Sequence, residues 1–348
     1  MRKTTAVLAA LASSAAVAAA QEESADDLHV KVGGVAEVRY AHTDDTKSWL
    51  DGGLGKTRYG SKQGRSADEF AVPLVALLVD ADYQEVVTAH VHLDLDAEPD
   101  AALDRGRVGL VEAYIGYRND LSRLFRLRLR GGLFFPPISL EHPGPAWTTV
   151  YTITPSAANS WVGEEIRTAG LEARLGVVSG QNELWLTGAA FGGNDPTGTL
   201  LAWRGWALHD RQTMSGEKLP LPPISSIGPA GLFSRQAPWD SPIREVDGRV
   251  GFYGGARVKV AGRLDLDGLY YDNRGDPAAF DGKQYAWATR FWNVGARLRL
   301  SAGLDLLGQY MDGSTAMGLR PNGVLLADVE NEAWYVLGSS TRGRRRSW

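Results

Sequence analysis

The chain has 348 residues, of which 44% are hydrophobic and 22% charged, and its formal net charge is −4. It contains no cysteine, which excludes a disulfide framework, a cysteine-based zinc site and a lipid anchor on cysteine. The acidic balance argues against nucleic acid as a partner, because binding to nucleic acid needs a basic surface.

The first 20 residues have the pattern of a cleaved signal peptide. Arg2 and Lys3 provide a basic start, residues 6–16 are apolar, and Ala18-Ala19-Ala20 fits an A-x-A cleavage site. The apolar stretch is too short to cross a bilayer as a helix. We therefore expect a secreted protein that begins at Gln21 after cleavage.

From residue 28 onward, apolar residues alternate with polar or small ones, which is the sequence signature of β-strands. Several of these segments reach the ~9–11 residues that a tilted membrane strand needs, and no later apolar run is long enough for a spanning helix. The clearest are 28–40, 88–95, 111–118, 169–177, 250–260, 292–300 and 332–339.

Short and long connections alternate strictly between these segments. Tight connections are expected around Ala81-Asp82, Asn119-Asp120, Gly180-Gln181, Ala261-Gly262 and Ser301-Ala302. Long ones are expected at Thr43–Ala67, Ala97–Arg107, Phe135–Arg167, Asn194–Gly248, Asn273–Gln284 and Gly313–Asn331, and the fourth would contain Leu200–Asp210. Outer-membrane barrels show this alternation of periplasmic turns and extracellular loops, whereas Greek-key sandwiches do not.

The pattern predicts a transmembrane antiparallel up-and-down β-barrel of about twelve visible strands. It would occupy residues 28–339, after the signal peptide 1–20 and a short periplasmic N-terminus at 21–27. We expect the protein to lie in the outer membrane of a Gram-negative bacterium.

The most distinctive local feature is Phe125-Arg126-Leu127-Arg128-Leu129-Arg130. In a strand, Arg126, Arg128 and Arg130 form an arginine ladder on the face opposite to the apolar side chains. An arginine facing lipid costs ~2–4 kcal/mol at mid-depth, so the ladder is predicted to face the lumen. Rows of arginine select anions in pores, although a basic strand balanced by acids such as Glu172 would show the same pattern.

The segment Phe135–Arg167 is the third long connection, and its later part could form a short helix after Pro155. If it folds into the lumen, its three glutamates would face the arginine ladder and create a transverse field across a narrow opening. The residues expected to set charge preference are Arg126, Arg128, Arg130, Glu141, Glu164 and Glu165.

The stretch Gly132-Leu133-Phe134-Phe135-Pro136-Pro137-Ile138-Ser139-Leu140-Glu141 resembles the G-Q-F-K-x-P-x-S-x-E stretch of the phosphate- and polyphosphate-selective porin family. It also falls at the matching place, where the fifth strand enters the third loop. The resemblance implies a sixteen-stranded, usually trimeric barrel in which this loop narrows the pore. Leu133 replaces the glutamine and Phe135 the lysine, so the resemblance implies a porin without implying phosphate as its solute.

These observations predict a channel for passive diffusion of small hydrophilic solutes, with a preference for anions, in contact with the lipid bilayer. No catalytic residue, cofactor or metal is expected. His90, His92 and Asp94 could hold a metal on one strand face, but a lumen face with titratable side chains is the commoner case. A barrel acting as receptor or adhesin through its long loops remains an alternative. A barrel hydrolase is another, and it would need a Ser–His pair brought together in space.

Residues 340–348 form an atypical basic tail. Counting back by twos from Trp348 gives Arg346, Arg344 and Arg342, so a strand in this register would direct three arginines at lipid. The tail is therefore not expected to close the barrel. Either the barrel closes at the twelfth strand, or the natural sequence continues past a frameshift or premature stop, which we favour.

Overall fold

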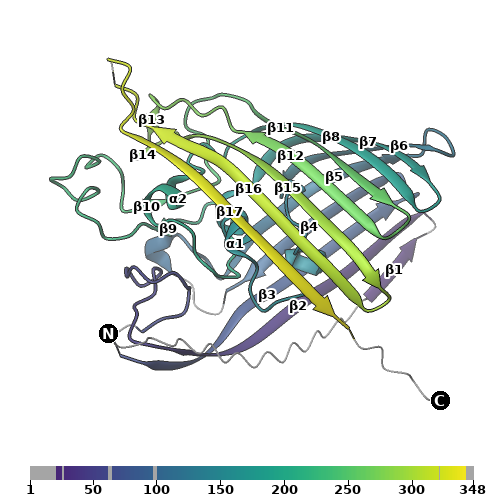
Figure 1. Cartoon of the computed structure of the whole chain (residues 1–348), viewed down its shortest axis with the longest axis horizontal. Coiled ribbons are helices and arrows are strands. Elements are labelled where there is room, and N and C mark those ends of the chain that lie inside the picture. The colour runs from purple at the N-terminus through teal and green to yellow at the C-terminus, as the bar shows by residue number, and fades with distance from the viewer. Residues whose placement is uncertain (1–20, 26, 62–64, 97–99, 321, 342–348) are drawn as a thin grey trace.

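The computed structural model describes residues 21–341 apart from 26, 62–64, 97–99 and 321. The predicted signal peptide and residues 342–348 of the basic tail lie outside the described residues. Thirteen strands pair in chain order to form one antiparallel sheet (Figure 1). The first, β1 (Gln21–Ala25), has five residues and the other twelve are longer.

The twelve long strands confirm the all-β, up-and-down organisation. They are β2 (Leu28–Thr43), β3 (Ala67–Tyr83), β4 (Val87–Leu95), β5 (Val108–Asn119), β6 (Phe125–Phe134), β7 (Thr168–Ser179), β8 (Asn182–Gly192), β11 (Gly251–Val260), β12 (Leu264–Asp272), β15 (Ala288–Ser301), β16 (Leu304–Met317) and β17 (Ala327–Ser340). Two small hairpins lie in the loops, formed by β9 (Leu219–Pro220) with β10 (Trp239–Asp240) and by β13 (Phe280–Asp281) with β14 (Gln284–Tyr285).

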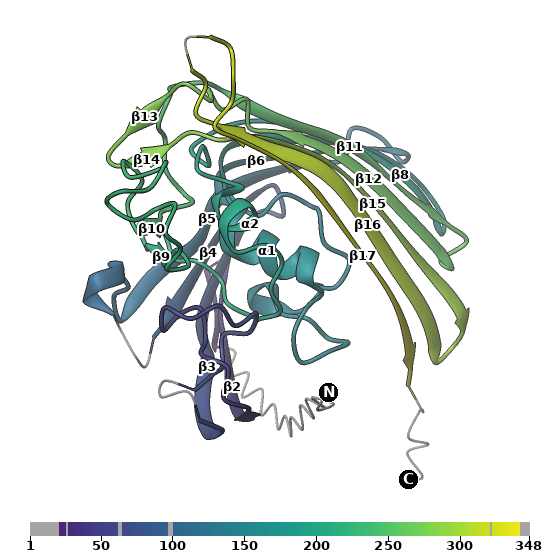
Figure 2. The same ribbon diagram turned by 60° about the vertical axis from the view of Figure 1, so that its left-hand side comes forward.

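The sheet curls around its own loops, so that it has a concave and a convex face (Figure 2). Its two end strands are β1 and β17, and within the described part of the chain they do not pair with each other. Side chains alternate between the faces. On β17, for example, Trp334 and Val336 are exposed on the convex face, while Tyr335 points inward and donates to Gln309 of β16.

The connections at one end of the sheet are tight, at residues 84–86, 120–124, 180–181, 261–263 and 302–303, and those at the other end are long. Several predicted boundaries were wrong. The tight turn expected at Ala81-Asp82 lies at 84–86, because β3 continues to Tyr83, and the connection expected at Asn273–Gln284 extends to residue 287. The sheet begins at Gln21 rather than at Leu28, and the last long connection is 318–326 instead of Gly313–Asn331. Charged residues occupy the convex positions at the start of β17, which hid the apolar alternation there.

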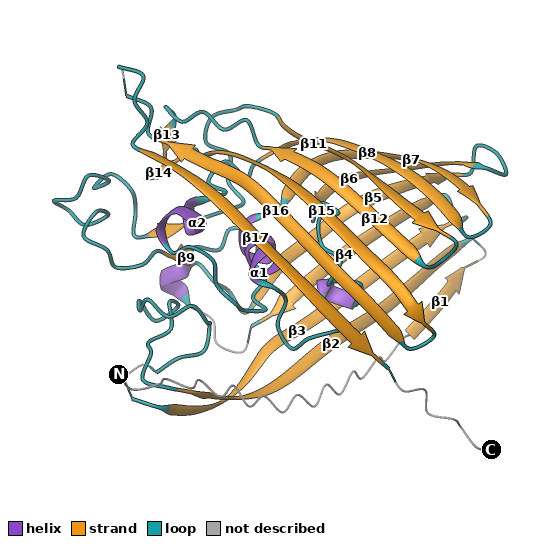
Figure 3. Ribbon diagram, in the orientation of Figure 1, coloured by secondary structure: helices purple, strands orange, loops and turns teal. Residues whose placement is uncertain are grey.

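The helical segments are short and lie in the loops, as Figure 3 shows. They are η1 (Ala101–Leu103), η2 (Pro145–Trp147), α1 (Ala157–Glu165) and α2 (Thr199–Trp203). Helix α1 follows Pro155 as predicted, and its N-terminus is capped by Ser156, which accepts a hydrogen bond from the Asn159 amide. In the described part of the chain, no helix is long and apolar enough to span a bilayer.

The main hydrophobic core lies between the loops and the concave face of the sheet. Trp161 and Val162 of α1 pack there against aromatic side chains of the sheet, including Phe291 of β15. The concave face of the sheet is called the wall from here on. Apolar side chains on the concave face are therefore buried where the long loops cover them. This packing fixes the position of the loop that carries three of the six predicted site residues, Glu141, Glu164 and Glu165.

Candidate functional site

The third long connection, residues 135–167, crosses the concave face and is called loop three from here on. Its first residue is held from both sides. The Phe135 amide donates to Glu112 of β5 at 3.0 Å, and Arg130 of β6 donates to the Phe135 carbonyl at 3.0 Å. Further on, the Asn293 side chain of β15 donates to the Ile138 carbonyl at 3.0 Å. Loop three thus runs from one part of the wall to the opposite part.

Glu141 holds the second half of loop three in place through hydrogen bonds. Glu141 is buried and accepts hydrogen bonds from the amide and the hydroxyl of Ser156, the latter at 2.6 Å, and from Asn159. Asn159 also donates to Gln309 of β16 at 3.0 Å. On the other side, Arg39 of β2 donates to the Ile153 carbonyl at 3.2 Å. Glu141 therefore organises the loop and its contacts with both ends of the sheet.

Glu164 lies at the end of α1 in a fully buried ion pair with loop four, which is defined as residues 193–250. Its carboxylate accepts a hydrogen bond from Arg204 at 3.0 Å and lies 2.9 Å from His209 Nε2. Burial alone would raise the pKa of Glu164, but Arg204 and His209 lower it to about 2. Glu164 therefore stays ionised and ties loop three to loop four.

Glu165 faces a second carboxyl group from loop four. It accepts hydrogen bonds from Trp161, from the Leu200 amide at 2.9 Å and from the Gly198 amide at 3.2 Å. Burial raises the pKa of Glu165 to about 7, and burial together with Glu165 raises the pKa of Asp240 well above its usual range. Asp240 lies close enough to Glu165 for two charges there to repel each other, so protonation of either carboxyl relieves the repulsion.

The arginine ladder lies on the concave face, but its partners are close neighbours on the wall. Arg126 and Arg128 both pair with Asp120 in the tight turn, at 3.0 and 2.8 Å, and Arg130 pairs with Glu172 of β7 at 2.8 Å. The expectation that the ladder faces the glutamates of loop three was wrong. Glu141, Glu164 and Glu165 accept hydrogen bonds from groups in loop three or loop four instead, because those donors lie closer to the three carboxylates than the arginines of the ladder do.

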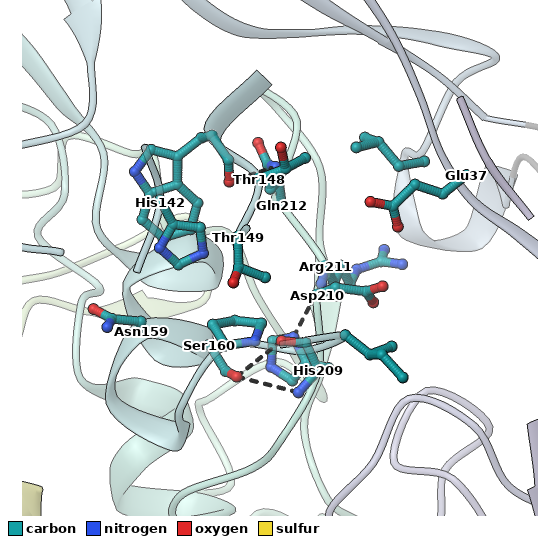
Figure 4. A pocket seen from close by; sticks show the side chains of 14 residues that line it. Glu37, His142, Thr148, Thr149, Asn159, Ser160, His209, Asp210, Arg211 and Gln212 are labelled. Atoms are coloured by element: carbon teal, nitrogen blue, oxygen red, sulfur yellow. Dashed lines mark hydrogen bonds between the residues drawn. The ribbon is translucent and has the colours of Figure 1, made fainter. Parts of the chain in front are cut away.

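A polar pocket lies where loops three and four meet the concave face of β2 and β3 (Figure 4). His142, Thr149 and Ser160 line it from loop three, His209 and Asp210 from loop four, and other side chains complete it. Its volume of about 20 Å³ has room for roughly one water molecule. This makes it a narrow polar gap between the two loops.

Charge in this pocket is concentrated at Asp210. The carboxylate pairs with Arg39 of β2 at 2.5 Å and with Arg58 at 3.1 Å. Burial works against its ionisation, but Arg58 and Arg39 lower its pKa below the usual value. Nearby, the Gln212 side chain donates to the Ala146 carbonyl at 2.8 Å, while its own oxygen has no partner among the described residues.

An aromatic stack forms one side of the polar pocket. The Trp147 ring lies parallel to the rings of Phe135 and His142, with centroid distances of 4.1 and 3.5 Å. Ser139 Oγ lies 2.7 Å from His142 Nδ1, but it also accepts the Glu141 amide. Burial lowers the pKa of His142 to about 3, which makes it a weak general base at neutral pH. This Ser–His contact therefore gives little support to a hydrolase.

The possible metal ligands have protein partners. His90 lies 2.7 Å from Asp80, and His92 lies 3.0 Å from Asp94, so the two histidines use different carboxylates. Elsewhere, carboxylate oxygens of Asp195, Glu245 and Asp247 lie within 4.8 Å of one another. All three accept backbone amide hydrogens, and this cluster holds the start and the end of loop four together.

Sequence reasoning missed the cations and amides that hold the loops, including Arg39, Arg204, His209 and Gln309. The only available signal was that buried glutamates need partners. A search of protein-family models finds none that matches this chain, and no curated protein matches it either.

Proposed function

We propose that this protein is a porin-like channel of the Gram-negative outer membrane, through which small hydrophilic solutes diffuse passively. The observation that carries the proposal is the convex face of the sheet, which is apolar and uncovered. Ile115, Leu171 and Val336 are 65, 71 and 67% exposed there. Large continuous apolar surfaces are rare on monomeric soluble proteins and mark contact with a partner or a membrane.

Aromatic side chains border this apolar face at both ends. Near the long loops, the rings of Phe252, Tyr270 and Trp292 adjoin on neighbouring strands, with centroids 6.0 and 4.6 Å apart. Near the tight turns, Tyr83 and Tyr117 are exposed on the same face. Aromatic belts of this kind lie at both interfaces of membrane barrels. They support an orientation with the aliphatic band in the hydrocarbon layer.

The concave face supports the role of a hydrophilic path. Its charged side chains form pairs along the wall, such as Arg257 with Asp265 at 2.7 Å and Arg297 with Asp305 at 2.7 Å. Loops three and four cover part of this face, and the polar pocket between them has room for about one water molecule, so the proposed path for solutes runs beside the two loops and not through that pocket. The signal-peptide pattern of residues 1–20 supports export, and the resemblance at loop three supports a porin, in which the protein would assemble as a trimer.

Recording in planar lipid bilayers tests the proposal. We expect the purified full chain, refolded in detergent, to insert and give stepwise, ohmic conductance, because the charged side chains of the concave face would offer ions a polar path. A detergent-only control and a heat-denatured sample should give no steps. If the folded protein inserts and never conducts, it is not a channel, and the receptor or adhesin alternative gains support.

The same recordings under a salt gradient test the arginine ladder. Replacing Arg126, Arg128 and Arg130 together by Gln leaves Asp120 and Glu172 without cations, so the reversal potential should shift toward cation selectivity. The matched variant Asp120→Asn removes one negative charge from the same cluster and should shift it in the opposite direction. An unchanged reversal potential in both would place the ladder outside the conducting path.

A further inference from the structure

A second pocket lies between loop three and the opposite part of the concave wall, and we call it the wall pocket. Loop three contributes Pro137, Ser139 and Leu140. The wall contributes mainly polar and small side chains, namely Arg174 of β7, Thr187 of β8, Gly255, Ala256 and Arg257 of β11, and Asp267, Gly268 and Leu269 of β12. The volume is about 70 Å³, enough for several water molecules and more than three times that of the polar pocket.

Two opposite charges in the wall pocket have unused hydrogen-bonding capacity. Within the described part of the chain, Arg174 Nε and Asp267 Oδ1 are buried without a hydrogen-bond partner. Such atoms are uncommon in proteins and call for a ligand or an ordered water. Arg257, by contrast, is directly opposite Asp267 in the sheet but is engaged by Asp265, with Nε donating at 2.7 Å.

The two charged side chains stand apart on the wall and are not arranged as a pair. In the sheet register, Arg174 of β7 is opposite Thr187 of β8, which is opposite Gly255 of β11. Asp267 comes from β12, the strand beyond. Because neighbouring strands are ~4.8 Å apart, the two side chains rise from backbones roughly 14 Å apart and lean toward the pocket from its two sides. Gly255 contributes no side chain to the floor between them.

We propose that the wall pocket is a binding subsite for small zwitterionic solutes, such as free amino acids and short peptides. The guanidinium of Arg174 receives the carboxylate of the solute, and the carboxylate of Asp267 receives its ammonium group. The hydroxyl of Thr187 lies between them on the floor of the pocket. The proposal rests on the channel function proposed above and names the class of solute that the channel would favour.

Charge balance distinguishes this site from a simple anion site. Arg130 and Arg257 are both neutralised by wall carboxylates, whereas Arg174 Nε in this pocket has no hydrogen-bond partner among the described residues. Asp267 lies in the same pocket and would repel a plain anion. A solute that carries both charges satisfies both side chains at once, and charge-assisted hydrogen bonds are the stronger kind.

Uptake of two labelled isomers into proteoliposomes tests the proposal. Glycine is a zwitterion and glycolamide is a neutral isomer of the same composition, so pore size alone cannot separate them. At low solute concentration we expect the native protein to admit glycine roughly tenfold faster, the order that a charged hydrogen bond supplies. Arg174→Gln and Asp267→Asn should each reduce glycine uptake to the glycolamide rate and leave the glycolamide rate unchanged.

Arg299→Gln serves as the matched control, because it also removes a concave-face cation but lies at the tight-turn end, paired with Asp305. It should keep the preference for glycine. Equal uptake of the two isomers by the native protein would overturn the proposal, and so would loss of preference in Arg174→Gln without loss in Asp267→Asn, which would indicate an anion site. If neither glycine nor glycolamide enters the proteoliposomes, the proposed channel function itself is wrong.

Discussion

At the scale of single residues, the buried carboxyl pair of Glu165 and Asp240 makes the contact between loops three and four sensitive to pH. The groups that face Glu165 are Asp240, the neighbouring Glu164 and the guanidinium of Arg204. Glu164 keeps its charge because Arg204 and His209 hold its pKa at about 2. Protonation of Glu165 or Asp240 therefore allows the three carboxyl groups to be buried together.

This pair leads to a prediction about stability. Burial raises the pKa of Glu165 from 4.5 to about 7 in the folded chain. The contribution of protonated Glu165 to the free energy of unfolding is therefore fully present below pH 4.5 and is lost as the pH rises through 7. The loss is about 3 kcal/mol at most, since one pKa unit corresponds to ~1.4 kcal/mol. Urea unfolding followed by tryptophan fluorescence suits the test, because Trp161 donates to Glu165.

Asp240→Asn should flatten this pH dependence, because an amide in that place can donate to an ionised Glu165. The control is Asp281→Asn, which alters an exposed carboxylate paired with Arg244. In this control variant, the urea midpoint should change between pH 5 and pH 9 as it does in the native protein. A native protein whose urea midpoint does not change over this range would contradict the raised pKa of Glu165.

At the scale of elements, the sequence located the strands well and the loop contacts poorly. Burying one face of a strand forces a period of two, and this signal can be read without knowing the partner strand. The partner of Glu164 is Arg204, forty residues further on and just after a five-residue helix, and no periodic pattern links them. The period of two placed the arginine ladder on the concave face correctly. The acid partners of the ladder were predicted wrongly, because no pattern in the sequence links a charged residue to a distant partner.

Gly198 shows how narrowly loop four fits the wall. It precedes α2 with φ of +99°, and a Cβ there would lie 2.1 Å from the hydroxyl of Thr315 and 2.6 Å from that of Thr289. Gly198→Ala should destabilise the docked loop by about 2–4 kcal/mol, from the left-handed backbone and from overpacking together. Faster trypsin cleavage within residues 193–250 would report the loosened loop.

The matched control for this change is Gly188→Ala on β8. A Cβ at Gly188 meets nothing within 4 Å, so the variant should be cleaved at the native rate. Equal cleavage of the Gly198 variant and the native protein would mean that α2 does not need the close approach to the wall.

At the scale of the whole molecule, the open seam between β17 and the first strands is the feature that a bilayer would not tolerate. An unpaired strand edge leaves its amides and carbonyls unsatisfied in hydrocarbon. Loop three already reaches both sides of the seam, through Arg39 of β2 and through Gln309 beside β17. In lipid, we therefore expect the two ends of the sheet to meet within one chain, which is the first of the two alternatives given for the basic tail and not the one favoured from the sequence alone.

Migration on denaturing gels checks this expectation. A sheet closed on itself resists detergent until it is heated, so the protein extracted from membranes should run as a compact monomer before boiling and as an extended chain afterwards. Protease resistance in intact membranes should accompany the compact band. A single band that does not change on boiling would contradict closure, and an unheated band of twice the mass would show that a second copy pairs with the free edge instead.

The contact between Asn159 and Gln309 also constrains the order in which the molecule folds. The two residues are 150 positions apart in the chain, whereas each tight turn joins strands that are next to each other. Local hairpins close with little entropic cost, and long loops cost more. We therefore expect the strands to pair as far as β16 before the contact between Asn159 and Gln309 forms. A chain halted before that step would have its strands paired and its passage still unobstructed.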